Sequence, residues 1–194
     1  MKRRVVVTGL GIISPVGNDV GTFWQALIAG KSGIGPLMTF DASAFDSRIA
    51  GEVKDFEPTK YLDPKDARRM EKFAQYAVAV AKQAFTDSQL DASKEDPNRI
   101  GVVIGSGIGS LRIIEEEHKV YLEKGPSRLS PFLIPMIIMN EAAGHVSIAL
   151  GLKGPNSCVA TACASGSHAL GDAFRIIQYG DADIMLAGGT ESCI

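Results

Sequence analysis

The chain has 194 residues, of which 45% are hydrophobic and 22% are charged, a balance typical of a folded globular domain. Its 20 basic and 22 acidic side chains give a formal net charge of −2, which argues against a general nucleic-acid binder. No apolar run reaches the ~18 residues that suggest a membrane-spanning helix, so the sequence predicts no transmembrane segment and no membrane partner.

The first sixty residues predict a strand, a helix and an irregular segment. Residues 4–8 form a β-branched apolar run that ends at glycines, which is typical of a buried strand. Residues 18–29 carry apolar side chains at helical spacing, and either Asn18 or Asp19 would cap that helix. Residues 30–60 are rich in glycine, proline, serine and aspartate, and predict a loop with short strands.

The middle of the chain predicts helices on both sides of one buried strand. Residues 64–88 show one long helical pattern with a continuous apolar face. Residues 99–105, RIGVVIG, form a short and fully apolar strand pattern. We expect a helix over 110–123, an extended segment over 127–135 and a further helix over 136–150.

The last third repeats this alternation. Residues 157–161 predict a strand, residues 164–179 a helix that ends in a left-handed turn at Gly180, and residues 182–187 another strand. Strands that alternate with helices predict an α/β fold with a mostly parallel sheet. No linker divides residues 1–194, and no internal repeat is visible.

Two glycine clusters follow predicted strands, VTGLGIIS at 7–14 and GSGIGS at 105–110. Each resembles a dinucleotide-binding fingerprint, but Ser14 and Ser110 stand where the last glycine belongs. We therefore favour a different role for these glycines, which is to let the chain turn sharply and let other groups approach the backbone closely.

The three cysteines are an odd number and too few for a disulfide scaffold, which favours a reducing, cytoplasmic location. Their spacing fits no zinc site, so we expect no metal. Cys158 lies inside a predicted strand and Cys193 in the last residues, and we interpret both as structural.

Cys163 lies between a predicted strand and a predicted helix, among small residues that leave room for a substrate. We expect it to join the first turn of that helix. The unpaired amides there lower the pKa of a thiol and stabilise an oxyanion formed when the thiolate attacks a carbonyl. A buried core thiol is the alternative. From the residues alone, nucleophile and core thiol stay equally open.

Four segments together carry a resemblance to a known family. Residues 154–170, GPNSCVATACASGSHAL, resemble the active-site signature of the β-ketoacyl-(acyl-carrier-protein) synthases, with Cys163 as the acyl-accepting cysteine. The segments VVVTGLGIISPVGN, RIGVVIGSGIGS and YGDADIMLAGGTES also resemble that family, and most of all its bacterial synthase II group. The resemblance covers essentially the whole chain.

This resemblance implies a fold and a reaction. The family has a thiolase-like αβαβα sandwich made of two similar halves. Its members pass an acyl chain from acyl carrier protein to the cysteine and condense it with malonyl-carrier protein, with loss of carbon dioxide, which is covalent catalysis in a ping-pong order. The resemblance implies no resident cofactor, because the phosphopantetheine arm arrives on the carrier protein. It also implies a homodimer.

One part of the family's machinery has no match here. Its two catalytic histidines and a lysine lie in its second half, and His118, His145 and His168 match neither histidine. We therefore expect residues 1–194 to be the N-terminal half of a condensing-enzyme domain whose C-terminal half is absent from this chain. On its own, such a half would lack the decarboxylation step.

Further site residues follow from the resemblance. Gly107 and Ile108 resemble residues that line and gate the acyl pocket, and the segment Phe132, Leu133 and Ile134 resembles the one that crosses the dimer interface and closes the partner's acyl tunnel. Two basic clusters resemble the carrier-protein docking surface, and opposite charge would steer an acidic carrier there. They are Lys65, Arg68 and Arg69, and Lys124 with Arg128. Core packing and a merely solvated surface are the respective alternatives.

Three functions fit the sequence. The first is a condensing enzyme of fatty-acid synthesis, and the second is a polyketide-type ketosynthase or a thiolase relative. The third is a non-catalytic scaffold, which is either a half-domain without the histidines or a chain-length partner subunit. The presence of Cys163 counts against the partner subunit, because partner subunits of that type usually lack this cysteine.

Overall fold

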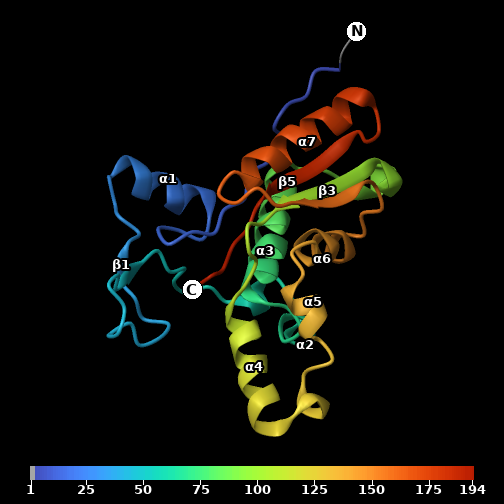
Figure 1. Ribbon diagram of the computed structural model, residues 1–194. Helices are drawn as coiled ribbons and strands as arrows, with labels where there is room; N and C mark the ends of the chain where they lie inside the picture. Colours follow the sequence, from blue (N-terminus) through green and yellow to red (C-terminus); the bar gives the residue numbers. More distant parts are fainter. Residues whose placement is uncertain (1–2) are drawn as a thin grey trace.

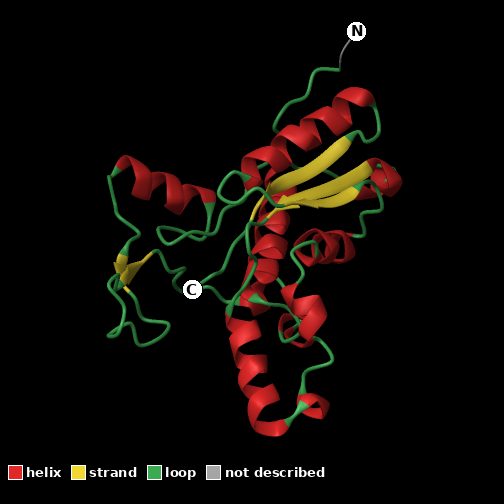
Figure 2. Cartoon of the chain, in the orientation of Figure 1, coloured by secondary structure: helices red, strands yellow, loops and turns green. Residues whose placement is uncertain are grey.

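The computed structural model describes residues 3–194, and its centre is a parallel sheet (Figures 1 and 2). Within these residues β3 (Ile100–Gly105) lies between β4 (Asn156–Val159) and β5 (Ile184–Gly189). Both pairings are parallel, and the register places Val102 of β3 opposite Asn156 on one side and Leu186 on the other. The predicted strands over 99–105, 157–161 and 182–187 are thus confirmed to within about two residues.

Helices cover both faces of this sheet. The helix α7 (Ser165–Tyr179) lies on one face against β3 and β5, while α6 (Glu141–Leu150) lies on the other and packs against α3 (Lys72–Asp87) (Figure 1). Helix, sheet and helix therefore form three layers, as the alternating pattern predicts for an α/β fold. The predicted left-handed turn after α7 is confirmed, because Gly180 has φ +87° and its amide donates to the carbonyls of Ile176 and Ile177.

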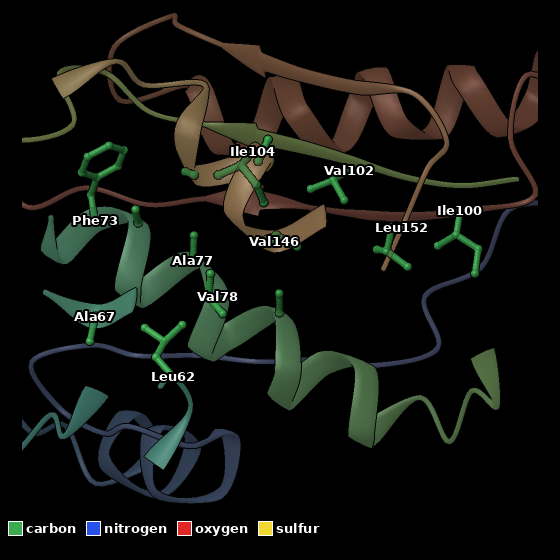
Figure 3. Packing of buried hydrophobic residues seen from close by; sticks show 14 residues of the cluster. Leu62, Ala67, Phe73, Ala77, Val78, Ile100, Val102, Ile104, Val146 and Leu152 are labelled. Carbon is green, nitrogen blue, oxygen red and sulfur yellow. The ribbon is translucent and has the colours of Figure 1, made fainter. Parts of the chain in front are cut away.

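The main core lies between β3 and α3. Every residue of β3 is buried, which explains why this strand reads as an unbroken apolar run and not as an alternating one. Figure 3 shows Phe73 and Val78 of α3 and Val146 of α6 in one buried cluster with Val102 of β3. This packing fixes the position of β3, and with it the loop that follows the strand.

The remaining elements lie around this centre. The helix α1 (Val20–Ile28) is capped by Asp19, whose carboxylate accepts a hydrogen bond from the amide of Thr22 at 2.8 Å, so the predicted cap is confirmed. The other described elements are the strands β1 (Gly35–Pro36) and β2 (Ile49–Ala50), the helices α2 (Pro64–Ala67), α4 (Arg112–Lys124) and α5 (Leu133–Ile137), and the 3₁₀ turns η1 (Pro58–Lys60), η2 (Ala92–Lys94), η3 (Pro97–Arg99) and η4 (Pro126–Arg128). No helix within residues 3–194 is long and apolar enough to cross a bilayer.

The strand predicted over residues 4–8 is wrong. These residues pair with no strand of the described chain, and Val6 and Val7 are 61% and 78% exposed. The following residues bind α3 instead, where Gln83 accepts the amide of Ile12 at 3.0 Å. A Cβ on Gly11 would lie 2.1 Å from the carbonyl oxygen of Val80, so this glycine serves the close approach that we inferred for it.

The single helix predicted over 64–88 is also wrong, because it breaks between α2 and α3. Glu71 at the break has extended backbone, and its buried carboxylate accepts hydrogen bonds from Ser110 Oγ at 2.9 Å and from Arg112 at 2.6 Å. At the break, the side-chain amide of Gln75 donates to the backbone carbonyls of Ala67 and Met70. Long-range polar contacts therefore override a continuous helical pattern.

The extended segment predicted over 127–135 is only partly right. The turn η4 occupies its start, and α5 begins at Leu133 after Phe132, so a short helix replaces the extended chain. The helix predicted over 136–150 accordingly divides into the end of α5 and all of α6.

Candidate functional site

The cysteine singled out by its surroundings lies at the carboxyl end of the sheet. Cys163 follows β4 and precedes α7, and it is exposed. The residue before it, Ala162, has φ +50°, a backbone conformation that costs a residue with a Cβ about 1 kcal/mol or more. The chain therefore makes a strained turn directly before the thiol.

Ser165 holds this turn. Its side chain is buried, its hydroxyl donates to the carbonyl of Ala162 at 2.6 Å, and its oxygen accepts the amide of Thr161 at 2.9 Å. The helix α7 begins at Ser165 with Ala164 as the N-cap, so Cys163 lies just outside the first turn that we expected it to join. This corrects the prediction. The Ser165 hydroxyl binds the backbone of Thr161 and Ala162, so Cys163 lies inside the turn that these bonds close and not in the helix.

Glycines at three positions let α7 approach the sheet closely. A Cβ on Gly105 would lie 2.3 Å from the carbonyl oxygen of Ser165, and one on Gly189 would lie 2.9 Å from the Cα of Gly166. Because real Cβ atoms do not occur at such distances, the backbones of β3, β5 and α7 meet without side chains between them. These contacts fix the start of α7, and therefore the Cys163 turn, relative to the sheet.

The other two cysteines have a different setting. Cys158 in β4 and Cys193 are partly buried, and all three thiols are free. Burial raises the pKa of Cys158. The pKa of Cys193 is raised mainly by burial and, to a smaller extent, by the negative charge of Glu191. Both therefore stay protonated at neutral pH, which agrees with our interpretation of them as structural.

Comparison with known proteins identifies the family. The sequence profile described as "Beta-ketoacyl synthase, N-terminal domain" matches residues 2–194. A 3-oxoacyl-(acyl-carrier-protein) synthase 2 of Synechocystis sp. is 52% identical over 193 residues, which are 100% of this chain and 46% of that relative. The chain belongs to the β-ketoacyl synthase family. It spans about half the length of the curated relatives it matches, at their N-terminal side.

Solved structures of β-ketoacyl synthases share the fold. The ishigamide ketosynthase/chain length factor superposes with a TM-score of 0.87 at 32% identity, over 100% of this chain and 49% of that chain. A type II PKS ketosynthase in complex with its acyl-carrier protein gives 0.86 at 30% identity, over 99% and 52% of the two chains. The fold is therefore the N-terminal half of a thiolase-like ketosynthase, as the resemblance implied.

The residues predicted to line the acyl pocket of the synthase lie beside the Cys163 turn. Gly107 and Ile108 follow β3, and a Cβ on Gly107 would lie 3.4 Å from the Cα of Ala162. The Ile108 side chain is 52% exposed. The loop amides that a nucleotide phosphate would need are already bound to the carboxylate of Glu191, which supports our preference against a dinucleotide site.

The segment Phe132, Leu133 and Ile134 lies at the start of α5, away from the Cys163 turn (Figure 1). Phe132 is 37% exposed and Ile134 is 58% exposed. The guanidinium carbon of Arg69 lies 4.6 Å from the centroid of the Phe132 ring, a cation–π contact. The structure therefore brings together a residue predicted for carrier-protein binding and one predicted for the acyl tunnel.

The predicted basic residues are all exposed and lie at three elements. Lys65, Arg68 and Arg69 lie in and directly after α2, whereas Lys124 ends α4 and Arg128 ends η4. A hollow of about 520 Å³ lies beside α2, and its lining includes Arg68 and the buried carboxylate of Glu71. Its lining comes from η1, α2, α3, α4 and α5 and from the residues between α2 and α3, and it includes none of the residues around Cys163.

None of the three histidines lies in a surrounding that would make it a catalytic base. His118 and His168 are exposed on α4 and α7. His145 on α6 is half-buried, and burial lowers its pKa although the charges of Glu141 and Asp66 oppose this shift. Its Nε2 lies 3.6 Å from the Glu141 carboxylate, too far for a hydrogen bond. No cluster of metal-ligating side chains occurs in the part of the chain that the structure describes.

Two residues of this site were missed from the sequence, Ser165 and Glu191. A serine two residues after a cysteine at a strand–helix junction is a signal for a turn-closing hydroxyl, since serine often bonds the nearby backbone. Glu191 lies two residues after the end of the last strand, and parallel strands bring their carboxyl ends to one edge. That placement by itself would have put this carboxylate near the GSGIGS loop.

Proposed function

We propose that this chain is the acyl-accepting half of a 3-oxoacyl-(acyl-carrier-protein) synthase of fatty-acid synthesis, an acyltransferase. The observation that carries the proposal is the exposed Cys163 on its strained turn, at the carboxyl end of the sheet of a β-ketoacyl synthase. In proteins built on parallel α/β sheets, ligands bind at the carboxyl ends of the strands. The 52% identity with a synthase 2 supports the reaction class.

The first half-reaction needs only a nucleophile and an oxyanion donor from this chain. The Cys163 sulfur attacks the thioester carbonyl of the acyl chain on the carrier protein. A new C–S bond forms to Cys163, the C–S bond to the phosphopantetheine arm breaks, and the released thiolate takes up the proton that Cys163 gave up. The Cys163 amide is one donor that would stabilise the tetrahedral oxyanion.

The second half-reaction needs groups that we assign outside residues 1–194. Malonyl-carrier protein would lose carbon dioxide, and its carbanion would attack the Cys163 thioester to give a 3-oxoacyl product. We propose that this step belongs to a C-terminal half that completes the domain, since this chain spans 46% of its relative. We propose no resident cofactor, because the phosphopantetheine arm belongs to the carrier protein.

The test of this function is acyl loading of the full-length protein that carries residues 1–194. Incubation with acyl carrier protein that bears a fatty acyl chain should add one acyl group, which peptide mapping should place on Cys163. We expect Cys163→Ala to remove this mass gain with little change in thermal stability, because its side chain is exposed. Cys158→Ala is the matched control and should load normally. Undiminished loading of Cys163→Ala would refute the assignment.

A polyketide-type ketosynthase is the second candidate. The similarity of the fold to a ketosynthase/chain length factor, with a TM-score of 0.87, favours it. The identity to that protein is 32%, against 52% to the synthase 2, and this difference favours fatty-acid synthesis. Loading rates with saturated acyl chains and with polyketone chains on the same carrier protein would separate the two functions.

The partner that we propose is acyl carrier protein, docked on Lys65, Arg68 and Arg69 and on Lys124 with Arg128. The support is that all five are exposed, and that a related ketosynthase was solved in complex with its acyl-carrier protein. Reversing the charge of Arg68 and Arg69 together should weaken carrier binding by about tenfold or more at low salt, since exposed opposite charges steer association. Unchanged affinity at low salt would rule out this docking surface.

We also propose that the full-length protein is a cytoplasmic homodimer. The exposed apolar side chains of Phe132 and Ile134 support an interface at the start of α5, and the free thiols support a reducing compartment. Sedimentation of the full-length protein as a monomer at micromolar concentration would contradict the dimer.

A further inference from the structure

One carboxylate gathers the loop that follows β3. Glu191 accepts the amide of Gly107 at 2.7 Å, the amide of Ile108 at 3.1 Å and the amide of Gly109. It also accepts the hydroxyl of Ser106 at 3.1 Å. Successive amides that converge in this way form an anion-binding concavity, and here the anion is supplied by the protein itself.

The backbone beside Glu191 holds the same loop from its other side. The amide of Thr190 donates to the carbonyl of Gly105, and that of Ser192 to the carbonyl of Gly109, each at 3.0 Å. The Glu191 carboxylate makes no ion pair within residues 3–194, so neutral donors alone hold it. Charge-assisted hydrogen bonds of this kind are about twice as strong as neutral ones.

This loop lies directly against the Cys163 turn. A Cβ on Gly107 would lie 2.9 Å from the Glu191 carboxylate and 3.4 Å from the Cα of Ala162. The loop is therefore confined between the carboxylate and the residue before Cys163. The side chain of Ile108 is 52% exposed while its amide is bound, so it is free to contact a bound chain.

We propose that Glu191 is a positioning residue for acyl transfer. By binding their amides, it fixes Gly107 and Ile108 beside the Cys163 turn, in the position that lets an acyl chain reach the Cys163 sulfur. This inference rests on the proposed acyl-accepting function. Glutamine has nearly the same size but would turn an NH₂ group toward donors that need an acceptor. The charge and the second acceptor oxygen of Glu191 therefore matter more than its bulk.

The test compares Glu191→Gln with wild type in the full-length protein. Two rates are measured, acyl loading of Cys163 from an acyl carrier protein that bears a fatty acyl chain, and alkylation of Cys163 by iodoacetamide. The second reagent is small and needs no acyl pocket. Asp183→Asn is the matched control, because Asp183 lies just before the opposite end of β5 and its carboxylate bonds arginines and not amides.

We expect the maximal loading rate of Glu191→Gln to fall by about tenfold or more, since a displacement of about 1 Å can cost a hundredfold in rate. The KM for the carrier protein should change little, because its docking surface is intact. Alkylation of Cys163 should stay within about threefold of wild type, because the exposed thiol itself is unchanged. Asp183→Asn should load at the wild-type rate.

Two results would overturn the inference. One is wild-type loading by Glu191→Gln, and the other is an equal fall of loading and alkylation, which would mean a purely structural role. The isosteric glutamine keeps the test decisive even where Glu191→Ala fails to fold. A wild-type protein that loads no acyl group would instead refute the proposed function, and with it this inference, so the two failures are distinguishable.

Discussion

The two ends of the parallel sheet are held together by different kinds of contact. At the amino end, side chains of opposite charge meet, since Arg99 donates to Asp183 at 2.8 and 2.9 Å and Arg3 donates to the same carboxylate at 2.6 Å. At the carboxyl end, glycine backbones touch and the Glu191 carboxylate binds backbone amides.

This difference has consequences for precision. Exposed ion pairs are screened by water and salt, and their long side chains adapt to small shifts of the elements that carry them. Contacts between backbones leave no such freedom, because no side chain can rotate to accommodate a shift. The end with the rigid contacts is the one that carries Cys163. The amino end therefore tolerates change that the carboxyl end does not.

We expect the largest loss of stability when a methyl group is added at the carboxyl end of the sheet. Gly105→Ala places a Cβ 2.3 Å from the carbonyl oxygen of Ser165, which is backbone and cannot rotate away. Because α7 must shift, we expect the free energy of unfolding to fall by about 3 kcal/mol or more. Urea denaturation monitored by circular dichroism measures this change.

Gly188 provides the control for that substitution. It lies in β5 one residue before Gly189, and a Cβ there meets no atom within 4 Å. Gly188→Ala should therefore change the free energy of unfolding by less than about 1 kcal/mol. If both substitutions destabilised the protein equally, close backbone packing would not be what holds the carboxyl end.

A smaller and pH-dependent effect is expected at the amino end. The guanidinium groups of Arg99 and Arg3 hold the pKa of Asp183 well below its usual value of 3.8. A carboxyl group whose pKa is lowered by folding stabilises the folded state above its unfolded pKa and loses that contribution as the pH falls. Asp183→Asn should thus lower the melting temperature at pH 7, with a difference that shrinks steadily below about pH 4.

Melting curves of both proteins between pH 7 and pH 3, at low salt and in 1 M salt, check this prediction. Added salt should reduce the difference at pH 7, since the pair is exposed. A difference that stayed constant with pH would show that the Asp183 charge does not contribute to stability.

Much of the fold follows from local patterns. The strand at 100–105 and the helix at 165–179 were predicted because each has a strong apolar period, and the Asp19 and Gly180 ends because caps depend on neighbouring residues. The position of Cys163 between a strand and a helix was predicted for the same reason. The Asp183–Arg99 pair was not, because its partners lie 84 residues apart.

The sequence by itself thus determined the α/β class, the central strand and the cysteine worth testing. Only the tertiary structure decided that residues 4–8 lie outside the sheet, that Glu71 breaks a helix and that Glu191 binds the loop after β3. The physical reason is common to all three. The spacing of apolar residues within a segment indicates which secondary structure that segment favours. Which groups it then pairs with depends on the distant residues that the packed core brings within hydrogen-bond distance.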